Sequence, residues 1–272
     1  MKIIITEGQF IEFDKILKEN TLNEIKSDEV DMSSFEVKKT LHPKFWSENM
    51  NLSRKVRLRL LKIADDFLES INIKSDLVDD YLLLGSLANY NWSKYSDIDL
   101  HILIDFKKIN KDIDLVEEYF NSKKKLWNEE HGSLKIYGFP IEIYIQNIDE
   151  DNASAGVFSL EKNKWIKKPS PIDENIIDRK KIQIKASDLI NDIEDLEKKY
   201  RKNLEIDEIE IISKKVKSIY DKIKRLRNSG LSTKKGEFSN GNIIFKLLRR
   251  TGYISKLIDL KRETYDKINT LK

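Results

Sequence analysis

The sequence contains no cysteine and only three histidines, His42, His101 and His131, among 272 residues. The lack of cysteine excludes disulfide bonds, thiolate zinc sites and cysteine nucleophiles. So few histidines also argue against a histidine-rich metal centre. A metal site in this chain would therefore be built from oxygen ligands, which favour magnesium, manganese or calcium.

Long apolar runs are missing as well, since no segment approaches the roughly 20 apolar residues that span a membrane. Residues 1–6 carry three isoleucines, but the chain turns polar at Glu7, too early for the apolar core of a signal peptide. We therefore expect a cytoplasmic protein without membrane contact. The same opening resembles the starts of bacteriophage reading frames, which suggests a phage or bacterial source.

Proline and glycine are scarce, with four and nine residues, whereas 36% of the residues are charged and 39% are hydrophobic. This balance is typical of a soluble, helix-rich protein with a sizeable core rather than of a disordered chain. The length allows one large domain or two of modest size.

The net charge of +3 hides an asymmetry along the chain. Residues 213–272 contain 17 Lys/Arg and 5 Asp/Glu, a formal charge of +12, and the remainder carries −9. A basic end suggests a polyanionic partner such as RNA, DNA or a triphosphate. Solvated helix faces account for the same charges, and charge alone does not choose between the two.

Hydrophobic patterning divides the chain into two parts. A short strand at 3–5 and a helix at 9–19 open the first part. Periodicities of two and 3.6 residues then alternate up to about residue 170. They predict helices at 53–71 and 112–130, and strands at 81–84, 97–104, 134–137 and 141–146, with a further hairpin at 156–168. After Pro169 and Pro171 the pattern is helical to the end. We therefore expect an α+β domain over 1–170, with an N-terminal helical extension, and a basic helical domain over 171–272.

The strand at 97–104 carries two acids on one face. Side chains alternate along a strand, so Asp97 and Asp99 point one way while Ile98 and Leu100 point into the core. Two carboxylates about 5 Å apart repel each other by roughly 3 kcal/mol at an effective dielectric constant of 20. A divalent cation would offset that repulsion.

A third acid, Glu142, alternates with isoleucines on the strand at 141–146. If this strand lies beside the first, the three acids share a face and could hold two magnesium ions about 4 Å apart, the arrangement used for in-line phosphoryl displacement. Gly85 and Ser86 follow a buried strand. There the backbone amides and the serine hydroxyl could cradle phosphate oxygens.

Together these residues resemble the motif of the DNA polymerase β-type nucleotidyltransferase superfamily, in which a strand ends in Gly-Ser, an Asp-x-Asp strand follows and a later strand carries the third acid. The match covers roughly residues 80–146. The resemblance implies a mixed sheet with flanking helices, followed here by a helical C-terminal domain. It also implies Mg²⁺ or Mn²⁺ as cofactor and a nucleoside triphosphate as substrate.

The resemblance also assigns roles to residues of this chain. Asp97 and Asp99 would bind both metals, and Glu142 would bind one and help to activate the attacking hydroxyl. Gly85 and Ser86 would hold the triphosphate. The third acid is often aspartate in the superfamily and is glutamate here, one methylene longer.

In this superfamily a helical region after the sheet often closes the nucleotide cleft. Lys246, Arg249 and Arg250 lie in such a region and are candidates to contact the triphosphate or a nucleic acid, with solvated surface charge as an equal alternative. The implied reaction transfers a nucleoside monophosphate to a hydroxyl and releases pyrophosphate. RNA such as a tRNA, a small molecule and a protein all stay open as acceptors, and synthesis of an oligonucleotide signal is a further option within this superfamily.

Two other interpretations compete with an enzyme. The first is a non-catalytic nucleotide- or RNA-binding module on the same fold. The second is a structural protein of a phage particle, which rests only on the opening residues and the many helices. The three acids argue against the first, because a pure binder of polyanions gains nothing from clustered carboxylates.

Overall fold

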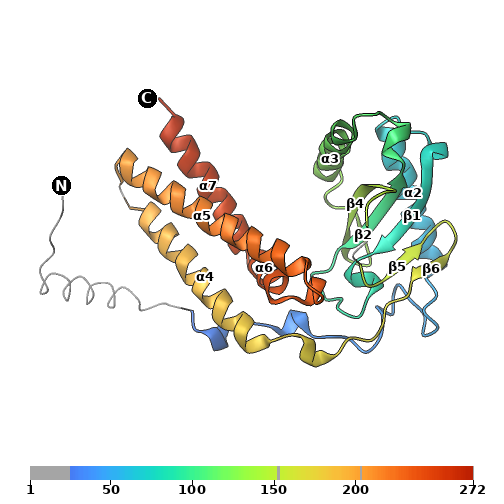
Figure 1. Ribbon diagram of the computed structural model, residues 1–272, viewed down its shortest axis with the longest axis horizontal. Coiled ribbons are helices and arrows are strands. Elements are labelled where there is room, and N and C mark those ends of the chain that lie inside the picture. The colour runs from blue at the N-terminus through green and yellow to red at the C-terminus, as the bar shows by residue number, and fades with distance from the viewer. Residues whose placement is uncertain (1–24, 152–153, 203, 272) are drawn as a thin grey trace, which may run out of the picture. The chain divides into compact units, whose positions relative to one another are not determined.

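A computed structural model describes residues 25–151, 154–202 and 204–271 (Figure 1). The strand expected at 3–5 and the helix expected at 9–19 lie outside the described residues. The chain forms two compact units. The first, here called the sheet unit, is Ser33–Ile176, and the second, the helical unit, combines Ile177–Lys272 with the described residues up to Met32.

The sheet unit is built on one six-stranded sheet in the order β3-β4-β2-β1-β5-β6. Its strands are β1 (Val78–Leu84), β2 (Ile98–Ile104), β3 (Lys135–Ile136), β4 (Phe139–Asn147), β5 (Val157–Ser159) and β6 (Lys164–Lys167). Strands β2 and β4 are parallel, and the other neighbours are antiparallel. The expected α+β class, with a mixed sheet and flanking helices, is confirmed.

Two helices accompany this sheet, α2 (Arg54–Ser70) and α3 (Ile113–Glu130) (Figure 1). Strand β2 alternates as its sequence predicts: its four isoleucine and leucine positions facing the core are fully buried, namely Ile98, Leu100, Ile102 and Ile104. They share one apolar cluster with the buried stripe of α2, which includes Leu60 and Phe67. Burying one face of β2 leaves the face that bears Asp97 and Asp99 for polar chemistry.

The segment before α2 supports the turn that follows β1. The indole Nε1 of Trp46, a side chain that is 3% exposed, donates a 2.7 Å hydrogen bond to the carbonyl of Leu87. Leu87 lies in η4, a three-residue 3₁₀ helix (Ser86–Ala88). From the other side, Gly156 approaches so closely that a Cβ there would overlap the carbonyl of Ala88. The turn bearing Gly85 and Ser86 is therefore fixed by tertiary contacts.

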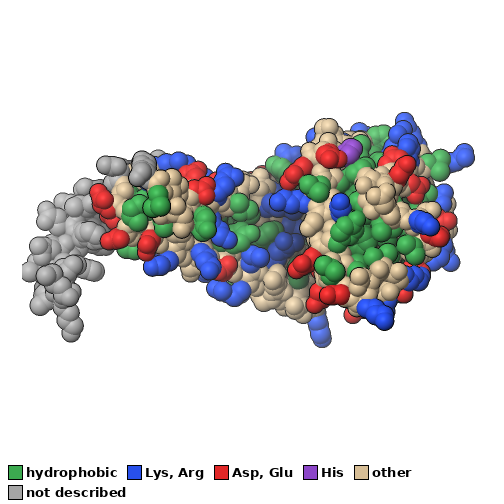
Figure 2. Space-filling view, turned by 90° about the horizontal axis from the view of Figure 1, so that it is seen from above, with side chains coloured by type: hydrophobic (Ala, Val, Ile, Leu, Met, Phe, Trp, Pro, Cys, Tyr) green, Lys and Arg blue, Asp and Glu red, His purple; other side chains and the backbone are tan. Residues whose placement is uncertain are grey.

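The helical unit contains α4 (Arg179–Tyr200), α5 (Ile206–Leu231), α6 (Asn240–Arg250) and α7 (Tyr253–Asn269). Part of its positive charge is neutralised internally, because Lys256 of α7 pairs with Glu194 and Glu197 of α4 at 2.8 and 2.6 Å. Figure 2 shows Lys and Arg side chains beside Asp and Glu on this unit. The acids of α4 thus offset some of the excess of cations that the sequence places at this end of the chain.

Within residues 25–151, 154–202 and 204–271, no helix is both long enough and apolar enough to cross a membrane.

Candidate active site

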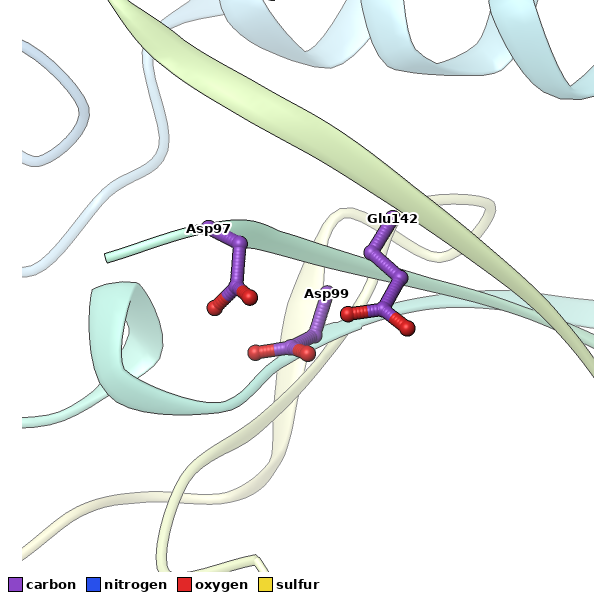
Figure 3. Close-up of side chains that lie close together, drawn as sticks. All are labelled: Asp97, Asp99 and Glu142. Atoms are coloured by element: carbon purple, nitrogen blue, oxygen red, sulfur yellow. The ribbon is translucent and has the colours of Figure 1, made fainter. Parts of the chain in front are cut away.

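The parallel pairing of β2 with β4 brings the three predicted acids together. Asp99 lies directly opposite Glu142 in the β2–β4 ladder. Asp97 precedes Asp99 by two residues, so its side chain lies on the same face. One carboxylate oxygen from each of the three residues lies within 4.8 Å of the others. Figure 3 shows the three carboxylates converging from the two strands. The register between the strands therefore builds the cluster that the sequence predicts only conditionally.

This cluster suits hard divalent cations. Magnesium binds oxygen at 2.0–2.1 Å, so two ligands of one ion lie at most about 4.2 Å apart. Oxygens within 4.8 Å of one another can hold one ion, or two bridged ions, after small side-chain rotations. Among the described residues, this is the one group of three or more acidic or histidine side chains with metal-binding spacing. The donor set contains only oxygen and fits Mg²⁺ or Mn²⁺.

Gly85 adjoins the cluster through its backbone. It adopts φ +76°, in the region that favours glycine, and a Cβ built there would overlap the Asp99 carboxylate. Asp99 therefore occupies space that any other residue at position 85 would fill. The sequence predicts that this glycine lets a phosphate approach the backbone. The structure shows that the carboxylate of Asp99, a catalytic candidate, lies against the same glycine.

Ser86 follows at the start of η4 and is held by a second serine. Its Oγ is 2.8 Å from Oγ of Ser96, which is 3% exposed and accepts a 3.0 Å hydrogen bond from the amide of Ser93. Ser96 comes directly before Asp97, so this bond connects the turn after β1 to the start of β2. Both predicted phosphate-binding residues, Gly85 and Ser86, thus lie in the sheet unit beside the carboxylates.

Lys124 is a neighbour of the cluster that the sequence did not reveal. It projects from α3, and its Nζ donates a 2.8 Å hydrogen bond to Oε1 of Glu142. The same ammonium lies 5.4 Å from the ring centre of Tyr144. The side chains of Lys124 and Glu142 are 23% and 43% exposed. No spacing in the sequence indicates the pair, because it depends on how α3 is placed against β4.

His101 lies on the same polar face of β2 as Asp99, but its side chain is hydrogen-bonded within the fold. Its Nδ1 lies 2.8 Å from Oε1 of Gln146, and its ring is 5.0 Å from that of Tyr144. Burial lowers the pKa of His101, against the opposing effect of the Gln146 hydrogen bond. The bond to Gln146 and the lowered pKa fit a structural role for this histidine.

The remaining predicted site residues lie in the other unit. Lys246, Arg249 and Arg250 are on α6, with Arg249 and Arg250 in its last turn. Their contact with a triphosphate or a nucleic acid stays a prediction.

Comparisons with known proteins add a distant structural likeness. No family model matches the chain, and no curated protein matches its sequence. Among solved structures, the chain is similar to the STING-associated CdnE c-di-GMP synthase from Capnocytophaga granulosa. The two share 14% sequence identity over 80% of this chain and 84% of that chain, with a TM-score of 0.21. Because this likeness is so distant, the proposals below rest on the geometry of the carboxylates and their neighbours.

Proposed function

We propose that this chain is a metal-dependent nucleotidyltransferase. It would transfer a nucleoside monophosphate from a nucleoside triphosphate to a hydroxyl group and release pyrophosphate. The observation that carries this proposal is the convergence of Asp97, Asp99 and Glu142 from two parallel strands, with their oxygens within 4.8 Å of one another. Such a cluster beside a backbone turn suits the binding of a metal–triphosphate complex.

Each carboxylate has a distinct place in this proposal. Asp97 and Asp99 leave the same face of β2 and would hold both cations, and Glu142 from β4 would hold one from the opposite side. Bound divalent cations would neutralise charge on the phosphoryl oxygens and lower the pKa of the attacking hydroxyl. Glu142, which pairs with Lys124, is the most exposed of the three acids. The acceptor hydroxyl would therefore approach the cluster from the side of Glu142.

The turn after β1 would position the triphosphate. Gly85 and the first residues of η4 present backbone to the cluster, and the Ser86 hydroxyl offers a further donor. In the reaction, the acceptor oxygen would form a bond to the α-phosphorus. The bond between the α-phosphorus and the oxygen that bridges it to the β-phosphorus would break. The hydroxyl proton would pass to a carboxylate of the cluster, for which Glu142 is the candidate, and pyrophosphate would leave with the electron pair of the broken bond. Catalysis would come mainly from positioning and charge neutralisation.

Several finer points belong to the same proposal. The catalytic domain would span residues 1–170 and the basic helical domain 171–272, with Lys246, Arg249 and Arg250 supplying cations for the triphosphate or an RNA acceptor. A cytoplasmic location and a phage or bacterial source also stay predictions. RNA is the acceptor that a basic end favours, and small molecules or proteins are the other acceptors to test.

The test is transfer of label by the full-length protein. Each α-³²P-labelled nucleoside triphosphate is incubated with the protein, Mg²⁺ or Mn²⁺, and total cellular RNA. Asp97→Asn/Asp99→Asn serves as the matched variant, because it removes two charges while keeping the side-chain shapes. We expect metal-dependent label in RNA, with release of pyrophosphate, and loss of both in the variant.

The other outcomes are equally informative. Release of pyrophosphate without labelled RNA would direct the search to small-molecule or protein acceptors. If no triphosphate yields pyrophosphate with any acceptor pool, while the folded protein still binds nucleotide, the enzyme proposal is wrong. The binding-module interpretation would then replace it.

A further inference from the structure

A cavity lies in the sheet unit, between α2 and the β3–β4 hairpin. Its volume is about 320 Å³, which is within the range of small-ligand pockets. None of the three catalytic candidates lines it. The lining residues are Lys55, Val56, Arg59, Ile63, Leu134, Lys135, Ile136 and Tyr137. The floor of the cavity is therefore apolar, and its ionisable residues are, apart from the tyrosine, all cations.

The cations of this pocket are not used elsewhere in the described structure. Lys55 and Arg59 are four residues apart on α2 and so share one side of the helix, and Lys135 comes from β3. None of the three forms an ion pair or a side-chain hydrogen bond with any residue that the structure describes. Three unpaired cations without an acid among the lining residues favour an anionic occupant.

Tyr137 adds an exposed aromatic ring at the rim. It forms the turn between β3 and β4 with Gly138, and it adopts φ +54° with 42% of its surface exposed. Two-residue turns with positive φ at both positions favour asparagine or glycine, so a tyrosine there is unfavourable for the backbone. On one side, the ammonium of Lys44 lies 5.7 Å from the centre of the ring. The ring packs edge-on against the buried Phe45, with 6.0 Å between the ring centres, and its exposed part offers a surface for stacking.

We propose that this pocket binds a nucleotide unit of single-stranded nucleic acid. The base would lie on Tyr137 and the apolar floor, and the backbone phosphates would meet Lys55, Arg59 and Lys135. Aromatic rings combined with a cationic track are the usual means of binding single strands. A strand suits the surface better than a free nucleotide, because a further cation, Lys44, lies outside the pocket beside the Tyr137 ring.

The pocket also lies at a useful end of the sheet. Strands β2 and β4 are parallel, with Ile98 opposite Ile141, so the turn at Tyr137 precedes β4 at the same end where Asp97 precedes β2. The pocket lies on the face of the sheet that α2 covers, opposite the carboxylates, so a bound strand would pass around this end of the sheet to reach the cluster as an acceptor. This use as an acceptor rests on the proposed function, whereas binding of the strand does not.

The test measures binding of a 5′-fluorescein-labelled, mixed-sequence, single-stranded 20-nucleotide RNA by fluorescence anisotropy with the full-length protein. We expect Lys55→Gln/Arg59→Gln to weaken binding at least fivefold at about 100 mM salt. It should also reduce the slope of log K against log salt by about 1.4, since each lost phosphate contact removes about 0.7 for single strands. The matched control, Lys62→Gln/Lys74→Gln, changes the net charge equally at exposed lysines that do not line this pocket.

A second variant separates binding from folding. Tyr137→Asn suits the turn better but loses the edge-on contact with Phe45, so we expect a melting temperature close to that of the wild type together with RNA binding weakened at least fivefold, as the loss of one stacked base implies. RNA containing 4-thiouridine should crosslink to a peptide that contains Tyr137. The proposal is overturned if both variants bind RNA as tightly as the wild type does. It is also overturned if free ATP binds at this pocket and RNA does not. Asp97→Asn/Asp99→Asn should still bind RNA, so a failed transferase assay leaves this test intact.

Discussion

The backbone of Gly85 lies directly against the carboxylate of Asp99, and a β-carbon at position 85 would overlap Oδ2 of that acid. Leu84, the residue before the glycine, pairs with Asp99 across the antiparallel β1–β2 ladder. The two parts of the motif, the glycine turn and the acidic strand, are therefore one steric unit. A change on either side of this contact would move the other.

The first prediction concerns Gly85→Ala. The added methyl would displace the Asp99 carboxylate, and the backbone at φ +76° would be strained. We expect at least a tenfold loss of Mn²⁺ affinity, measured by electron paramagnetic resonance, and loss of most transferase activity. Strain should also lower the free energy of unfolding by about 1–3 kcal/mol.

Gly138→Ala is the matched control for that substitution. Gly138 also has a positive φ, +92°, but a Cβ there meets no atom within 4 Å. The control should therefore reproduce the strain and the loss of stability while keeping Mn²⁺ affinity. Equal loss of Mn²⁺ affinity in the two variants would show that strain, and not the contact with Asp99, explains the effect.

The second prediction concerns the ion pair between Lys124 and Glu142. The lysine competes with a cation for the glutamate, so Lys124→Gln should raise Mn²⁺ affinity about two- to fivefold, as expected for a partly exposed pair. Lys125→Gln makes the same charge change on the exposed side of α3 and should have less effect. Isothermal titration calorimetry at several salt concentrations measures the Mn²⁺ affinity of both variants. Lower affinity in Lys124→Gln would instead indicate that the lysine supports the site.

The third prediction concerns the serine pair beneath the turn. Ser96→Ala would leave the buried amide of Ser93 without its partner and free the Ser86 hydroxyl. An unsatisfied buried amide costs about 1–3 kcal/mol, so urea unfolding should show a loss of that size. Ser86→Ala removes only the bond between the hydroxyls and should cost less. If both variants raise the KM for the triphosphate, Ser96 acts by positioning Ser86.

The fourth prediction is a pH dependence of the helical unit. The hydrogen bond from Lys256 lowers the pKa of Glu197 below its ordinary value of 4.5, against an opposing effect of burial. A lowered carboxyl pKa stabilises the fold above the unfolded value, and that stabilisation is lost as the pH falls through the folded value. The protection factors of amides in α4 and α7, which are corrected for the pH dependence of intrinsic exchange, should therefore fall below about pH 4.5. Glu197→Gln should show a smaller change over the same range.

Local patterns in the sequence were enough to predict the helices and strands and to identify the three acids. The alternation over residues 97–104 places Asp97 and Asp99 on one face of a strand, and the structure shows the opposite face fully buried. The hairpins at 134–146 and 156–168 were also predicted, because turn residues and alternating patterns are local signals. The first of them turns at Tyr137 and Gly138, so Phe139 and Pro140, which the sequence predicted to lie between the strands, belong to β4. The roles of Lys246, Arg249 and Arg250 stay predictions.

Only the tertiary structure decided what surrounds the acids. The sequence by itself determined that Asp97, Asp99 and Glu142 occupy polar positions on strands, because side-chain direction follows from backbone geometry alone. It did not determine that β4 lies parallel to β2, which sets Glu142 opposite Asp99. The contacts of Lys124 and Gly85 with these acids, and the basic pocket at Tyr137, likewise join residues far apart in the chain. Such contacts arise from packing between elements, which no local period in a sequence encodes.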